Sequence, residues 1–426
     1  MNAVQIASVI IFLLTIIIVA TEGIHRMYAS LLGSGAMVLV GAVSAEEIFH
    51  FIDIEILAVI VGMMLLVRGA ERSGIFNFIA KKIIKSSRSL TSFAIVLMFL
   101  TLILSIFLEN IGGMLIAATI TIPLARSLKI KPDTFLIFQA IIVNIGGMML
   151  LMSSIPNIIV AVEGGISFSS FLVNIAPIGA ILFVVTLLIF LRVFGSEVEK
   201  GITQEMRSLE FSDWVDLSVM EFDKKGEGWR MAVAALIMVF TIIGFAVYDR
   251  IGLTPAFVAM AGGYLMLMFS GEGPVKALRG IDWSTVIFLA GLFVLVNCLD
   301  KNGLIDMLSD WMLNLVDRLP VNVPTAVMWL SAIPSGVVDN IPLTATLAPV
   351  MSRWIQEGAS ADVWWGLVLG ANLGGCLTPI GSPSSIIAIG IAEQEGHPIP
   401  LGRFTIICIV VTMVNLLVST IYLYFI

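Results

Sequence analysis

Long apolar runs follow one another along almost the whole chain and carry few charged positions. Windows of about 17 to 25 apolar residues predict ten membrane-crossing helices, near 4–20, 28–44, 54–70, 133–150, 171–194, 229–247, 254–270, 283–299, 363–378 and 404–424. Two further apolar stretches, about 90–126 and 322–355, are interrupted in the middle by LENIGG and VVDNIP. Each is too long for one helix and awkward for two full crossings. We therefore expect two re-entrant hairpins whose tips lie inside the membrane.

Composition agrees with this pattern. The 426 residues are 59% hydrophobic and 12% charged, with a mean hydropathy of +1.05, which indicates an all-α polytopic membrane protein. The three cysteines are far apart in sequence, so we expect them to pack rather than to pair or bind metal. The three histidines fall at predicted loops, which leaves no nucleophile–base or metal set at depth. We expect no enzymatic activity, no metal, no cofactor and no nucleic-acid partner.

The chain contains an internal repeat. The segment that begins at Phe51 pairs with the one that begins at Gly280, and the register continues through Glu109 and Asp339, 230 positions apart. NIGG and NLGG then meet 228 positions apart. The first half has five predicted crossings, an odd number, so the second half must be inserted upside down. We therefore predict two inverted-topology repeats, 1–194 and 229–426, with helices broken at the midplane and a cytoplasmic linker at 195–228.

The basic residues predict the orientation. If both hairpins are re-entrant, 19 of the 23 Lys and Arg fall on one side, which the positive-inside rule makes cytoplasmic. This predicts a multi-pass protein of the inner (cell) membrane with both termini outside. The first hairpin would open to the cytoplasm and the second to the exterior.

Polar residues gather at four breaks in the apolar pattern. Glu109 and Asp339 each precede an asparagine at a hairpin break, and we predict that they carry the coupling proton or cation. The second pair of breaks contains paired glycines and a proline, which we expect to prevent a regular helix and leave backbone groups free for a ligand. The predicted substrate-binding residues are Asn110, Asn144, Gly146, Gly147, Ser153, Ser154, Asn157, Asn340, Thr344, Asn372, Gly374, Gly375, Thr378, Gly381, Ser382, Ser384 and Ser385.

Asparagines and glycine pairs also serve as packing elements in membrane helices, so either feature alone favours a structural role. Their presence at two related breaks, with an acid each time, favours a transport site. At DNIPLTAT, GANLGGCLTPIGSPSS and LENIGG the chain resembles the arsenical-pump membrane proteins, the NhaD-type antiporters and the melanosomal P protein, within the citrate-transporter-like ion transporter superfamily. The resemblance covers nearly the whole chain. It implies inverted repeats with two hairpins and the transport of arsenite or antimonite, sodium and protons, or carboxylates.

Departures from the superfamily narrow these alternatives. The Ser-Asn-Thr signature of the sodium-coupled dicarboxylate branch is missing at both tips, and no Lys or Arg is predicted at the midplane to balance a carboxylate substrate. The leading hypothesis is a proton-coupled exporter of arsenite- or antimonite-like hydroxides that works by alternating access. The alternatives are a sodium/proton antiporter of the NhaD type and a small-anion or carboxylate transporter. The expected partners are the inorganic substrate, H⁺ or Na⁺ and the lipid bilayer, with a second copy of the chain or a soluble ATPase as the resemblance suggests.

Overall fold

The computed structural model describes residues 1–21, 23–84, 89–127, 131–201 and 228–426, and this part of the chain is helical without strands. The first half contains α1 (Ala3–Ala20), α2 (Arg26–Leu39), α3 (Ile48–Phe51), α4 (Ile54–Ser73), α5 (Ile75–Ile84), α6 (Leu90–Phe107), α7 (Asn110–Ser127), α8 (Asp133–Met149), the 3₁₀ turn η1 (Leu151–Ser153), α9 (Ile155–Glu163) and α10 (Phe168–Gly201). The second half contains α12 (Gly228–Ile251), α13 (Pro255–Phe269), α14 (Pro274–Arg279), α15 (Trp283–Lys301), α16 (Leu304–Val316), α17 (Val323–Ser335), α18 (Asn340–Gln356), α19 (Val363–Gly374), α20 (Pro383–Gln394) and α21 (Leu401–Leu423).

The predicted all-helical architecture is confirmed. Each of the ten predicted crossings coincides with a helix, and the two interrupted stretches form the helix pairs α6–α7 and α17–α18. By length and composition, α1, α10, α12, α15 and α21 could each cross a membrane, within the described residues. The arms of the second pair contain 13 and 17 residues. At 1.5 Å per residue they extend about 20 and 26 Å, less than the roughly 30 Å of a hydrocarbon core.

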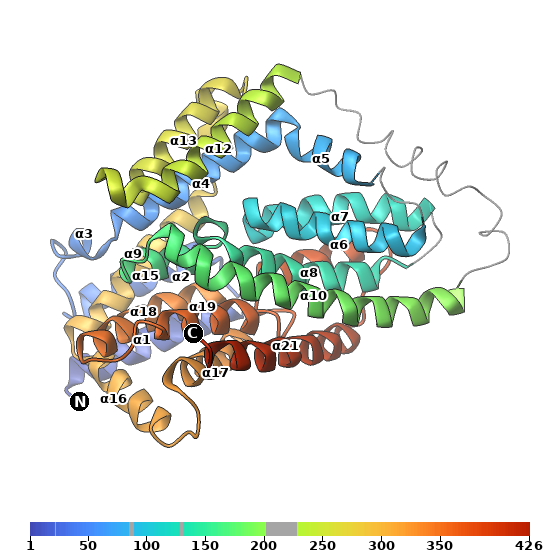
Figure 1. Ribbon diagram of the computed structural model, residues 1–426. Coiled ribbons are helices and arrows are strands. Elements are labelled where there is room, and N and C mark those ends of the chain that lie inside the picture. Colours follow the sequence, from blue (N-terminus) through green and yellow to red (C-terminus); the bar gives the residue numbers. More distant parts are fainter. Residues whose placement is uncertain (22, 85–88, 128–130, 202–227) are drawn as a thin grey trace.

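The two halves pack in matching ways. Helix α4 packs along α13, as α2 packs along α15, and α6 packs along α8, as α17 packs along α19. The halves also interlock, because α9 of the first contacts α18 of the second while α20 contacts α7. Figure 1 shows α4, α12 and α13 together at one edge and α6, α7, α8 and α10 together in another part. The inverted orientation of the halves stays a prediction, as does the linker at 195–228, of which 202–227 lie outside the described residues.

Ion pairs join the helix ends. Arg68 contacts Glu272 at 3.0 Å where α4 and α13 end, and Lys301 contacts Glu47 at 2.7 Å at the end of α15. Arg403 contacts Asp133 at 2.7 Å where α21 and α8 begin. Each pair connects ends that the positive-inside pattern assigns to the same side of the membrane. The packing therefore agrees with the predicted order of crossings.

Candidate functional site

The two predicted carboxylates lie at helix-pair tips. Glu109 lies in the short break between α6 and α7, and Asp339 is the residue that precedes α18. Asp339 Oδ1 accepts a hydrogen bond of 3.0 Å from the Ile341 backbone N–H, which caps the helix. The Asp339 side chain is 18% exposed, so it is partly shielded from solvent. Both acids are thus carried by non-helical backbone, as the sequence predicted.

Each tip opens onto a cavity. Glu109 lines a cavity of about 240 Å³ together with Ser153 and Ser154 from the break between α8 and α9. Asp339 lines a second cavity of about 450 Å³ together with Pro383 from the start of α20. Ile111 lines both cavities, so they lie on either side of the first tip. Each acid therefore faces the helix break of its own half.

Buried amides and hydroxyls connect the two halves. Asn144 on α8 donates from Nδ2 to Ser384 Oγ at 2.9 Å and accepts at Oδ1 from Ser382 Oγ, also at 2.9 Å. In the opposite direction, Asn372 on α19 donates to Asn157 Oδ1 at 3.1 Å and accepts from Ser154 Oγ at 3.3 Å. All of these side chains are buried. The asparagine of each half therefore bonds to the break of the other half.

The asparagines at the two tips differ in their bonding. Asn110 Nδ2 donates to Asn144 Oδ1 at 3.1 Å, which joins the first tip to the amide network. Asn110 Oδ1 and Asn340 Nδ2 are buried and have no hydrogen-bond partner within the described residues. One is an acceptor and the other a donor, and an unpaired buried polar atom carries a free-energy cost unless a ligand or water completes it. These two atoms are candidates for ligand contacts.

Several predicted site hydroxyls bond to backbone carbonyls. Thr344 Oγ1 donates to Asn340 O at 2.7 Å within α18. Ser153 Oγ donates to Ile106 O and Thr378 Oγ1 donates to Gly336 O, and these bonds tie each break to the helix pair of its own half. Ser385 is buried and its backbone N–H donates to Ser382 O at 3.0 Å. These residues hold the site in shape.

The glycine pairs were expected to prevent a regular helix, and that expectation is wrong for the first pair. Helix α8 continues through Gly146 and Gly147 to Met149. A Cβ on Gly146 would lie 2.7 Å from Ser105 Cβ of α6, and one on Gly147 would lie 2.4 Å from Asn110 Oδ1. The glycines are needed because the helix pair packs directly against α8.

The second pair has the same packing role. A Cβ on Gly374 would lie 2.3 Å from Ala332 O of α17. Here the helix does end, since α19 stops at Gly374. Gly375 and Gly381 then approach each other closely, because a Cβ on either would lie under 3.0 Å from the carbonyl oxygen of the other. This approach folds the break back toward α17.

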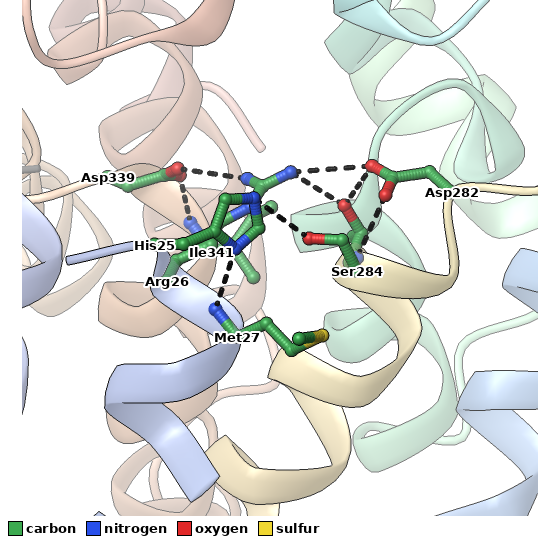
Figure 2. Close-up of polar contacts among 8 residues, drawn as sticks. His25, Arg26, Met27, Asp282, Ser284, Asp339 and Ile341 are labelled. Atoms are coloured by element: carbon green, nitrogen blue, oxygen red, sulfur yellow. Dashed lines mark hydrogen bonds and ion pairs between the residues drawn. The ribbon is translucent and has the colours of Figure 1, made fainter. Parts of the chain in front are cut away.

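The structure adds Arg26 and Asp282 to the site. The sequence did not predict a basic residue beside the acids, but Arg26 Nη1 lies 3.9 Å from Asp339 Oδ2. Figure 2 shows the Arg26 guanidinium between the carboxylates of Asp339 and Asp282, and Arg26 Nη2 lies 3.5 Å from Asp282 Oδ2. Comparing the halves could not reveal Arg26, because the corresponding positions at the start of α13 are Thr254 and Pro255.

Comparisons with known proteins agree with the resemblance read from the sequence. The sequence profile CitMHS, described as citrate transporter, matches residues 16–370. An uncharacterized transporter of Mycobacterium tuberculosis is 29% identical, over 99% of this chain and 98% of its own length. The human P protein is 27% identical, over 90% of this chain and 55% of its own length. The crystal structure of the YdaH transporter of Alcanivorax borkumensis shares the fold, with a TM-score of 0.60 at 14% identity, over 91% of this chain and 86% of that one.

Proposed function

We propose, from the premise that the chain belongs to the CitMHS citrate-transporter family, that it is a proton-coupled secondary transporter that exports arsenite- or antimonite-like hydroxides. The observation that carries the proposal is the pair of carboxylates, Glu109 and Asp339, at matching tips beside cavities. The two cavities together are lined by four carboxylates and two guanidinium groups: Glu71, Glu109, Asp282 and Asp339 against Arg26 and Arg68. This excess of negative charge favours a proton, a cation or a neutral cargo over a free anion.

The cargo would bind between the tips and the helix breaks. Arsenite is an uncharged trihydroxide at neutral pH, so its oxygens and hydroxyl protons need both donors and acceptors. Asn340 Nδ2 can donate to such a cargo and Asn110 Oδ1 can accept from it, because both are buried without a protein partner in the described chain. A carboxylate at each tip would take up a proton from one side and release it to the other. Alternating access then couples proton and cargo.

A sodium/proton antiporter is the second candidate. It is favoured by Asn110 Oδ1, an unpaired buried oxygen in the helix that follows Glu109, since hard cations bind oxygen ligands. A carboxylate transporter is the third candidate, favoured by Arg26 beside Asp339 and by the description of the family. It would require a bound cation to offset the excess of carboxylates over guanidinium groups that line the cavities. The cargo assay distinguishes all three.

The test is flux into proteoliposomes under an imposed pH gradient, with arsenite, ²²Na⁺ and citrate compared in parallel. We expect arsenite movement to follow the gradient. Asp339→Asn and Glu109→Gln should leave folding intact and uncouple flux from the gradient, with the larger defect at Asp339. Glu47→Gln, which alters a surface acid, is the control. Full coupling in the Asp339→Asn/Glu109→Gln double variant would overturn the proton-carrying role, and gradient-driven ²²Na⁺ or citrate flux without arsenite flux would overturn the cargo.

The orientation is part of the same proposal. We infer that the protein lies in the cell membrane with both termini outside. A cysteine placed within 202–227 should then react with an impermeant thiol reagent only from the cytoplasm, and one that replaces Asn302 only from outside. Labelling of both from one side would remove the inverted-repeat arrangement.

A further inference from the structure

Arg26 occupies an unusual position for a cation. It is the first residue of α2, where the helix dipole disfavours positive charge. Three contacts from α15 offset this: the ion pair with Asp282, a hydrogen bond of 2.6 Å from Nη2 to Thr285 Oγ1, and the Phe288 ring, whose centre is 5.7 Å from the guanidinium carbon. The guanidinium is thereby held at a fixed place at the start of α15.

The Arg26–Asp339 contact differs from the contacts within α2 and α15. Asp339 Oδ1 is engaged in capping α18, and Oδ2 faces Arg26 Nη1 at 3.9 Å. That separation is beyond hydrogen-bond distance, so the attraction is electrostatic. The contact therefore leaves Oδ2 close to a positive charge without a direct hydrogen bond to it.

The two residues belong to different packing units. Helices α2 and α15 pack closely, since Ser34 Oγ donates to Gly291 O at 2.9 Å and a Cβ on Gly291 would lie 2.7 Å from Ser30 Oγ. Asp339 instead belongs to the α17–α18 pair, which packs mainly on α19 and has a smaller contact between α18 and α15. The Arg26–Asp339 contact is thus a link between the α2–α15 unit and the second tip (Figure 2).

We propose that Arg26 is a built-in counter-ion that competes with the coupling proton or cation for Asp339. In the unloaded state it neutralises the Asp339 carboxylate and ties the tip to the α2–α15 unit. A proton on Asp339 removes the attraction and releases the tip. This rests on the proposed function, because it requires Asp339 to carry the coupling ion.

Other titratable groups face the same contact. Asp282 holds Arg26 from α15, and Glu109 lies within electrostatic range of Arg26, Asp282 and Asp339. His25 caps α2 through Nδ1 and lies 3.4 Å from Ser284 Oγ through Nε2. Asp282 and Glu109 both attract a proton, whereas Arg26 opposes it. Removing the charge of Arg26 should therefore lower the proton concentration at which coupling is half-maximal, and removing the charge of Asp282 should raise it.

The experiment measures gradient-driven arsenite flux in proteoliposomes as a function of pH. We expect Arg26→Gln to reach half-maximal coupling at about tenfold lower proton concentration than the wild type, because one neighbouring positive charge is lost. Arg26→Lys keeps the positive charge, so its proton concentration at half-maximal coupling should remain near that of the wild type. Asp282→Asn should need a higher proton concentration than the wild type to reach half-maximal coupling. Arg72→Gln is the control, since Arg72 pairs with Glu272 at 3.5 Å and has no role at the tip.

Each outcome bears on a different proposal. If Arg26 is purely structural and only holds α2 to α15, Arg26→Gln and Asp282→Asn should have lower thermal stability. Neither variant should then change the proton concentration at half-maximal coupling. That result in a coupled wild type would overturn the counter-ion role and leave the proposed function standing. If Arg26→Gln does not fold, Asp282→Asn alone decides through the sign of its shift. Absence of pH-driven flux in the wild type would overturn the proposed function itself.

Discussion

Replacing Asn144 with alanine removes four hydrogen bonds at once, two of which join the halves. Asn144 donates to Ser384 Oγ and Ala140 O and accepts from Ser382 and Asn110 at 2.9 to 3.1 Å. The two serines keep a bond to each other, of 2.9 Å, but Asn110 Nδ2 loses the one partner described for it. An orphaned buried donor costs about 1–3 kcal/mol, and each lost bond between membrane helices about 0.6 kcal/mol. The expected loss of unfolding free energy is therefore about 2–4 kcal/mol.

Asn415→Ala is the matched control. Asn415 on α21 is also fully buried, and it pairs with a single side chain, Thr186 of α10, at 3.0 Å. Because the freed Thr186 hydroxyl can donate to a carbonyl of the preceding turn of α10, the expected loss is only about 0.6–1 kcal/mol. Equilibrium unfolding in mixed detergent micelles, followed by tryptophan fluorescence, compares the two variants. A loss in Asn415→Ala that equals or exceeds the loss in Asn144→Ala would refute the idea that the crossed network holds the halves together.

Three further predictions test other features. Gly374→Ala should lower the free energy of unfolding by about 1–3 kcal/mol through overpacking against α17. Gly390→Ala is the control in the same micelle assay and should be neutral or stabilising, because no atom lies within 4 Å of the new methyl group. The Lys301 hydrogen bond lowers the pKa of Glu47 from 4.5 to about 2. In thermal scans, the wild type should therefore be more stable than Lys301→Met by the full amount above about pH 4.5, and this difference should vanish as the pH falls through about 2. Cys376 is buried beside Asn372, and Cys376→Ala should keep most arsenite flux, whereas complete loss would indicate a thiol ligand.

The hydrophobic pattern predicted the helices and the positions of both tips. It did so because a break in a membrane helix needs polar or flexible residues, and Glu109 and Asp339 supply that signal in an apolar background. It did not predict that Asn144 bonds to the second half. An internal repeat shows which residues correspond, such as Asn144 and Asn372, but correspondence does not determine which residues touch.

The glycines and Arg26 show two further limits. NIGG was read as a helix break, but the helix continues because the missing Cβ atoms allow α6 and α7 to pack against α8. Sequence alone cannot separate these two uses of glycine. Arg26 lies at the end of an apolar run, where a basic residue usually marks the membrane surface. Its contact with Asp339 depends on how far the second tip extends, and only packing determines that.

The crossed bonds between the halves also affect how the protein is made. Asn144 finds its partner Ser384 only after 240 more residues have been added. At roughly 5–20 residues per second, that interval lasts about 12–48 s. During this time the first half is already long enough to insert, yet its central amide has no partner in the second half. Completion of the core therefore waits until the second break has been made, and a nascent chain truncated before that break would lack both serine partners of Asn144.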